Sequence, residues 1–135
     1  MTAITTRSGR DSTDSLLRFA LRADATLCGA VGLLIAMAAD PLSRLSGLSA
    51  TSEWIAGAAL VGYGLALYVA AGVPDVRRVG IGVFVGNIAF TVVVAVVLIA
   101  GWLPLTALGV VSMIAFTVAT LAFAYAQYLG VRRLA

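Results

Sequence analysis

The stretch RFALRADATLCGAVGLLIAMAA, residues 18–39, decides the fold of this chain. Its residues 25–39 carry no charge, and as an α-helix they would span only about 22 Å at 1.5 Å per residue. The hydrocarbon layer of a bilayer is about 30 Å thick, so a helix that crosses it must extend back through Arg22 and Arg18. Arginine side chains at such positions can reach the lipid headgroups. We therefore expect the first membrane helix at 15–39.

Three more apolar segments follow this helix, at 54–73, 79–102 and 105–129. All three prolines fall at segment ends, as expected for a residue that interrupts helices: Pro41, Pro74 and Pro104. We predict an all-α fold, a polytopic membrane protein whose four transmembrane helices form one bundle within residues 15–130. Residues 1–14 would form a polar tail that is disordered in isolation, and residues 131–135 a basic C-terminus.

The composition is that of a membrane protein. Of the 135 residues, 61% are hydrophobic and 11% are charged, whereas soluble domains are about 45–50% apolar and about 25% charged. The net charge of +3 comes from arginines that flank the apolar segments and form no continuous patch. We therefore expect no nucleic-acid partner.

The arginines also predict an orientation. Eight of the nine lie before residue 25, where the charge-free part of the first segment begins, between the second and third segments, or after the fourth, and only Arg44 lies in the first loop. Positive charge is enriched on the cytoplasmic side of membrane proteins, so both termini are expected to be cytoplasmic. Trp54 and Trp102 would then lie at the outer interface. We place the protein in the bacterial inner (plasma) membrane, as a multi-pass protein.

Small residues at helical spacing predict where the helices approach one another. Such ridges occur in three segments: Asp24, Cys28, Gly32 and Ala36; Ala58, Gly62, Ala66 and Ala70; Ala115, Ala119, Ala122 and Ala126. The pair Gly82 and Gly86 in the third segment is expected to pack within the bundle, with homodimerisation as the alternative. The loop at 42–53 is expected to be exposed.

Four polar residues fall in the cytoplasmic half of the predicted bundle: Asp24, Asn87, Tyr125 and Gln127. We expect them to form a hydrogen-bonded cluster that fixes helix packing, and a proton- or cation-coupled role for Asp24 is the alternative. Arg22 lies about 200° round the helix from Asp24, so the two cannot pair within that helix. The outer half offers almost nothing polar between the helices, which argues against an aqueous path through the bundle.

Four further arginine positions are expected to contact lipid headgroups or partner proteins: Arg18, Arg22, Arg77 and Arg78. The sequence has no histidine, and Cys28 is its only cysteine. These absences exclude Ser–His catalysis, haem ligation by histidine and an intrachain disulfide. We expect no catalytic residues, no cofactor and no metal site.

Four short motifs stand out: Leu21 to Asp24 (LRAD), Gly86-Asn87, Gly101 to Thr106 (GWLPLT) and Gln127 to Arg133 (QYLGVRR). With these motifs the chain resembles a family of small, uncharacterised four-helix bacterial membrane proteins of actinobacterial type, across roughly residues 16–133. The resemblance implies a fold and no activity. Small multidrug-resistance-type exporters also have four helices, but they need a membrane glutamate in the first segment, where this chain has Asp24 at a different depth.

These observations favour a non-catalytic accessory or stabilising subunit of a larger inner-membrane complex, for example a lipid-import transporter or a respiratory supercomplex. Its partners would be other integral membrane subunits and membrane lipids. The alternative is a small dimeric proton- or cation-coupled transporter that uses Asp24. A lipid-binding protein with an acyl chain between its helices is a third hypothesis, and an enzyme is the least favoured.

Overall fold

The computed structural model describes residues 2–134, and the side chains of residues 13–134. It contains five helices: α1 (Thr2–Met37), α2 (Ala39–Ser46), α3 (Ala50–Ala70), α4 (Val76–Ala100) and α5 (Ala107–Arg133). Four of them are long and apolar enough to cross a membrane, namely α3, α4, α5 and the Thr13–Met37 part of α1. The prediction of an all-α protein is therefore confirmed for the described residues, and four of its helices are candidate membrane spans.

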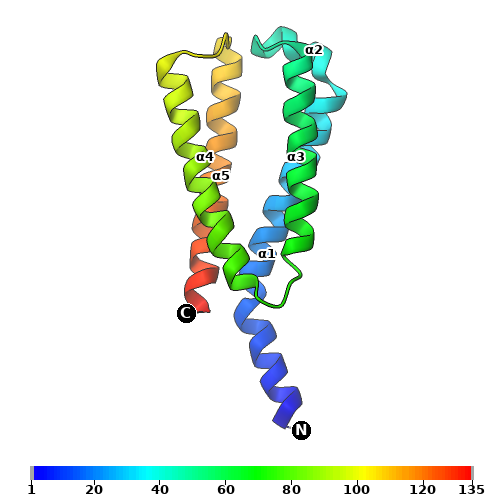
Figure 1. The fold of residues 1–135 in the computed structure, drawn as a ribbon, viewed down its shortest axis with the longest axis vertical. Coiled ribbons are helices and arrows are strands. Elements are labelled where there is room, and N and C mark those ends of the chain that lie inside the picture. The colour runs from blue at the N-terminus through cyan, green and yellow to red at the C-terminus, as the bar shows by residue number, and fades with distance from the viewer. Residues whose placement is uncertain (1, 135) are drawn as a thin grey trace.

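The helices form two pairs. Helix α1 packs along α3, and α4 packs along α5, whereas in the described part of the chain α3 makes no extensive contact with either α4 or α5. The pairs converge at the end that carries the α3–α4 turn and the last turn of α5, and they separate towards α2 (Figure 1). We call these the C-terminal end and the α2 end of the bundle.

Glycines allow α1 and α3 to approach closely. A Cβ atom on Gly32 would lie 2.6 Å from the carbonyl oxygen of Gly57, and one on Gly64 would lie 2.6 Å from that of Ala25. The predicted ridge through Gly62 is wrong as a packing surface, because Gly62 is exposed and no other helix of the described residues comes within 4 Å of its Cβ position. Helical periodicity identified a small-residue face on α3, but the packed face is the neighbouring one.

The C-terminal end holds the hydrophobic core. Its buried members come from α1, α3, the α3–α4 turn and α4: Leu17, Leu21, Ala25, Leu67, Ala71 and Val76. Helices α4 and α5 approach Leu17 through two glycines, since a Cβ on Gly80 or Gly130 would lie 2.8 Å from Leu17 atoms. This end is where the two helix pairs are joined by direct packing.

Two helix boundaries differ from the prediction. Helix α1 begins at Thr2 instead of residue 15, so the predicted tail is the first part of α1 and projects beyond the other helices (Figure 1). No proline interrupts 2–37, and an existing membrane helix removes the nucleation step for the residues that extend it. The predicted loop at 42–53 is also wrong in part, because it contains the end of α2 and the first turn of α3.

At the α2 end, the helix pairs are held together by a backbone hydrogen bond between two turns, and not by a hydrophobic core. Gly47 ends α2 with a left-handed backbone (φ 89°), and its N–H donates to the Ser43 carbonyl at 3.1 Å. The N–H of Thr106 donates to the carbonyl of Ser46 at 2.9 Å, which ties the start of α5 to the end of α2. The two helix pairs are thus joined at both ends, with less packing between them in the half near α2.

Candidate functional site

Three polar side chains meet where α1, α4 and α5 cross. The carboxyl oxygen Oδ2 of Asp24 accepts hydrogen bonds from Nε2 of Gln127 at 2.8 Å and from Nδ2 of Asn87 at 3.3 Å. Nδ2 of Asn87 also donates to Oε1 of Gln127 at 3.0 Å. All three residues are buried. We call Asp24, Asn87 and Gln127 the polar triad.

The hydrogen-bonding groups of the polar triad find their partners within the triad and in one neighbouring residue. The other carboxyl oxygen of Asp24, Oδ1, accepts from Sγ of Cys28 at 3.4 Å. Every buried side-chain nitrogen or oxygen in the described residues has a hydrogen-bond partner. Interhelical hydrogen bonds of this kind average about 0.6 kcal/mol in membrane proteins. The geometry therefore suits a contact that fixes how three helices cross.

Tyr125 lies outside this cluster, contrary to the expectation from sequence. Its side chain is 64% exposed and lies on the outer face of α5, beside Phe84 and Leu121. Tyr125 is two residues from Gln127, which is about 200° round the helix, so the two cannot face the same neighbour. The two residues were grouped because they lie at a similar depth along the segment, but they point to different sides of the helix.

Two of the four arginines expected at headgroups or partners have contacts within the chain. Nη1 of Arg18 donates to the carbonyl oxygens of Ala71 and Val73, both at 2.8 Å, and Nη2 pairs with Asp14 at 3.0 Å. Arg18 thus satisfies carbonyls at the end of α3, where the helix itself offers no partner. The guanidinium of Arg22 lies over the ring of Tyr68, 5.3 Å from its centre.

The other two arginines lie on the surface of the C-terminal end. Arg77 is exposed, and Arg78 forms an ion pair with Asp75 at 3.0 Å between two exposed side chains. Exposed ion pairs contribute little to stability, typically about 0–1 kcal/mol. These two positions have the exposure that contact with headgroups or a partner requires.

A cavity of about 510 Å³ lies between α3 and α5 near α2, and we call it the α2-end cavity. Its walls are mostly apolar and include Leu60 and Tyr63 of α3 and Phe116 of α5. Glu53 also lines it, on the first turn of α3. The volume falls within the range of about 300–1,000 Å³ that is usual for small-molecule sites.

A smaller cavity of about 220 Å³ adjoins the polar triad and is called the triad cavity. It is lined by Asp24 and Asn87 together with Cys28 and Thr120. Four side chains line both cavities and form the partition between them: Leu60, Tyr63, Phe90 and Phe116. Phe90 and Phe116 contact each other edge to face, with ring centres 6.0 Å apart. The two cavities are therefore neighbours across an aromatic partition.

Glu53 is the site residue that sequence reasoning missed. It is only 7% exposed, and Oγ of Ser46 donates a hydrogen bond to its Oε1. The α2 end is the half that we expected from the sequence to be the outer one, with almost nothing polar between its helices. The burial of Glu53 there makes that expectation wrong. The sequence did contain a sign of this helix, because serine is a favoured N-cap residue. Ser49 caps α3 by accepting from the N–H of Ser52, and a helix that begins there contains Glu53.

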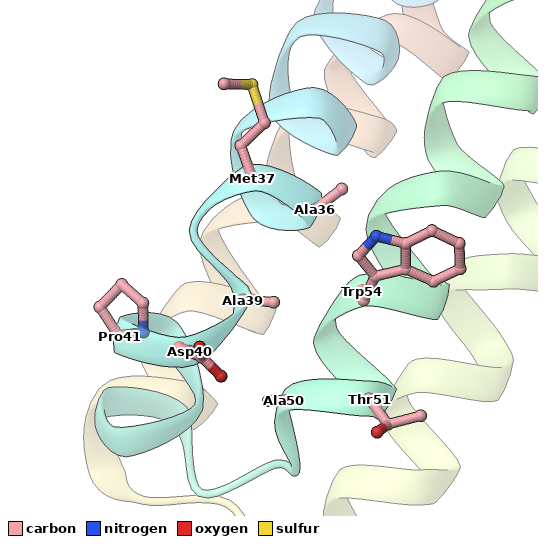
Figure 2. Close-up of a pocket in the computed structure, with 8 residues that line it drawn as sticks. All are labelled: Ala36, Met37, Ala39, Asp40, Pro41, Ala50, Thr51 and Trp54. Carbon is pink, nitrogen blue, oxygen red and sulfur yellow. The ribbon is translucent and has the colours of Figure 1, made fainter.

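A third hollow lies on the surface where α1 meets α2, opposite the start of α3 (Figure 2). Its lining includes Met37, Asp40 and Trp54, all of them exposed. Trp54 is 57% exposed, as suits an indole at a membrane interface. This hollow is a surface depression and brings no set of reactive groups together.

No protein-family model, curated protein or solved structure matches this chain. The four long apolar helices indicate a small four-span membrane protein, and the resemblance to an actinobacterial family stays a prediction. Within the described residues, no three His, Cys, Asp or Glu side chains lie close enough together to hold a metal ion.

Proposed function

We propose that this chain is a non-catalytic subunit of a larger membrane assembly and docks through one face of α4. The observation that carries this proposal is the position of Gly82 and Gly86. Both are exposed, and no other helix of the described residues lies within 4 Å of a Cβ placed on either one. Gly82 therefore does not pack within the bundle as expected, and Gly86 makes no helix contact there but lines the triad cavity.

The same face continues along α4. Ala89 and Val93 follow Gly82 and Gly86 at helical spacing, and both are exposed. We call these four residues the α4 glycine face. A Gly-xxx-Gly pair lets a second helix approach closely enough for backbone contact in a membrane. Glycine costs about 1 kcal/mol relative to alanine inside a helix, and packing against a partner helix would offset that cost.

The proposed orientation follows from the arginines. Arg77, Arg78, Arg132 and Arg133 lie at the C-terminal end of the bundle, and Arg44 lies in α2 at the other end. With positive charge on the cytoplasmic side, the C-terminal end faces the cytoplasm of a bacterial plasma membrane. The Gly82 position of the α4 glycine face then lies in the cytoplasmic half, about 9 Å from the start of α4.

Purification from the native membrane in mild detergent tests the subunit proposal. A tagged copy should bring down integral membrane partners in fixed stoichiometry, and Gly82→Leu with Gly86→Leu should release them. Gly62→Leu is the matched control, because Gly62 is also an exposed glycine, on α3, with no other described helix within 4 Å of its Cβ position. A clean monomer would sink the proposal. A homodimer that the α4 double variant dissociates would assign the face to self-association instead.

One observation favours the transporter alternative. Asp24 lines the triad cavity, so its carboxyl group is next to space that a small cation or water could enter. A transporter that couples through this group should lose transport in the Asp24→Asn variant while the protein is still made. Wild-type uptake in proteoliposomes of that variant would end this alternative.

A further inference from the structure

The α2-end cavity combines an acidic group with apolar walls. Glu53 lies on the first turn of α3, and Tyr63 lies on the same helix ten residues later, about 15 Å along the axis. The cavity is lined between these two levels by Leu60 of α3 and by Met113 of α5. It therefore has one carboxyl end and one aromatic end.

No basic side chain of residues 13–134 forms an ion pair with Glu53. The ion pairs of the described residues are Arg18 with Asp14 and Arg78 with Asp75, and neither involves Glu53. Arg44, the arginine of nearby α2, is exposed and forms no ion pair with it in the described part of the chain. Buried acidic side chains are normally paired with a positive charge. The partner of Glu53 within the chain is a neutral hydroxyl, that of Ser46.

The aromatic end of the cavity, like the carboxyl group of Glu53, suits a positively charged ligand. Tyr63, Phe90 and Phe116 line the cavity, and aromatic faces attract organic cations as well as apolar groups. A phospholipid acyl chain fits this site less well, because its phosphate would be brought towards the carboxyl end. The cavity lies between helices that make no extensive contact in the described residues, and two of its lining aromatics, Tyr63 and Phe90, are partly exposed.

We propose that the α2-end cavity binds a lipophilic organic cation, with the positive group at Glu53 and the apolar body against Tyr63, Phe90 and Phe116. This site is separate from the α4 glycine face. None of the four residues of that face lines the α2-end cavity, although Gly86 lines the adjoining triad cavity. The cation site therefore does not rest on the proposal that the chain is a subunit.

The test compares two probes of nearly equal shape and opposite charge, tetraphenylphosphonium and tetraphenylborate. Binding to the full chain in phosphatidylcholine nanodiscs is measured by calorimetry, with empty nanodiscs subtracted. We expect saturable binding of tetraphenylphosphonium and weaker binding of tetraphenylborate. Glu53→Gln should lower tetraphenylphosphonium affinity about tenfold or more, which corresponds to 1.4 kcal/mol. Glu53→Asp keeps the charge and should retain most of the affinity.

The Glu53→Gln variant is a fair test because it keeps a side-chain oxygen that can accept from Ser46. Its unfolding midpoint should match that of the wild type, which separates lost binding from lost folding. Asp40→Asn is the matched control, because Asp40 is an exposed carboxyl at the same end that does not line the α2-end cavity, and it should leave tetraphenylphosphonium affinity unchanged. Equal affinity for the two probes, or unchanged affinity in Glu53→Gln, would overturn the proposal. A tightly held phospholipid that tetraphenylphosphonium does not displace in native mass spectrometry would also overturn it.

Discussion

The two ends of the bundle use the same few residue types in opposite ways. Near the C-terminal end, glycines bring backbones together and the buried carboxyl of Asp24 accepts from three donors on Asn87, Gln127 and Cys28. At the α2 end the helix pairs separate, and the buried carboxyl of Glu53 has one hydroxyl partner and a cavity. We infer from this contrast that a buried carboxyl group holds the fold where its neighbours satisfy it and is available to a ligand where they do not.

The largest effect is expected where the C-terminal end is tightest. A Cβ on Gly130 would lie 2.8 Å from Cα of Leu17, so Gly130→Leu forces α5 away from the backbone of α1. We expect a loss of roughly 3 kcal/mol in the free energy of unfolding, at the upper end for overpacked cores. An SDS titration in mixed micelles, followed by circular dichroism, measures it. Gly62→Leu on the exposed face of α3 should change little.

The next effect concerns the polar triad. Gln127 is fully buried and both donates to Asp24 and accepts from Asn87, so Gln127→Leu leaves two buried polar groups short of partners. We expect a loss of about 2 kcal/mol, within the range for unsatisfied buried groups. Tyr125→Phe, two residues away on the exposed face, is the control and should unfold like the wild type. Equal stability of the two variants would show that the triad does not hold the helices together.

A smaller effect is expected at the edge of the C-terminal end. Arg18→Met keeps an apolar stem but removes the two hydrogen bonds to the carbonyls of Ala71 and Val73. Because Arg18 is partly exposed, water can replace these donors, and we expect a loss of about 1 kcal/mol. Amide exchange at the last turn of α3 should speed up in the same variant. Unchanged exchange would mean that Arg18 does not cap this helix.

The spans could be predicted from the sequence because a lipid-embedded backbone must bond within its own helix, so hydropathy and prolines mark the segments. Depth along those segments also grouped Asp24, Asn87 and Gln127, which meet in the structure. The angular position was harder to predict. Tyr125 shares the depth of Gln127 but faces away, and periodicity alone could not say whether Gly62 or Gly64 faces α1.

Glu53 was missed for a different physical reason. A charged residue next to serine and threonine is typical of a loop. The burial of Glu53 depends on α2 and the α4–α5 turn, which are far apart in sequence. The tie between Thr106 and Ser46 exists only once the two helix pairs are assembled. Burial of a side chain by a distant turn leaves no periodic pattern that a sequence can display.

The smallest effect on stability is expected at Glu53, and this is what makes it the sharpest test of the contrast between the two ends. Glu53→Gln should leave the free energy of unfolding within about 0.5 kcal/mol of the wild type, since one neutral contact is retained. Asp24→Asn disturbs a carboxyl oxygen that accepts twice, and it should cost about 1 kcal/mol. Measured in one SDS titration, a larger loss for Glu53→Gln than for Asp24→Asn would reverse the roles assigned to the two carboxyl groups. If instead Glu53→Gln is stable and loses the organic cation, its carboxyl group is held for a ligand and not for the fold.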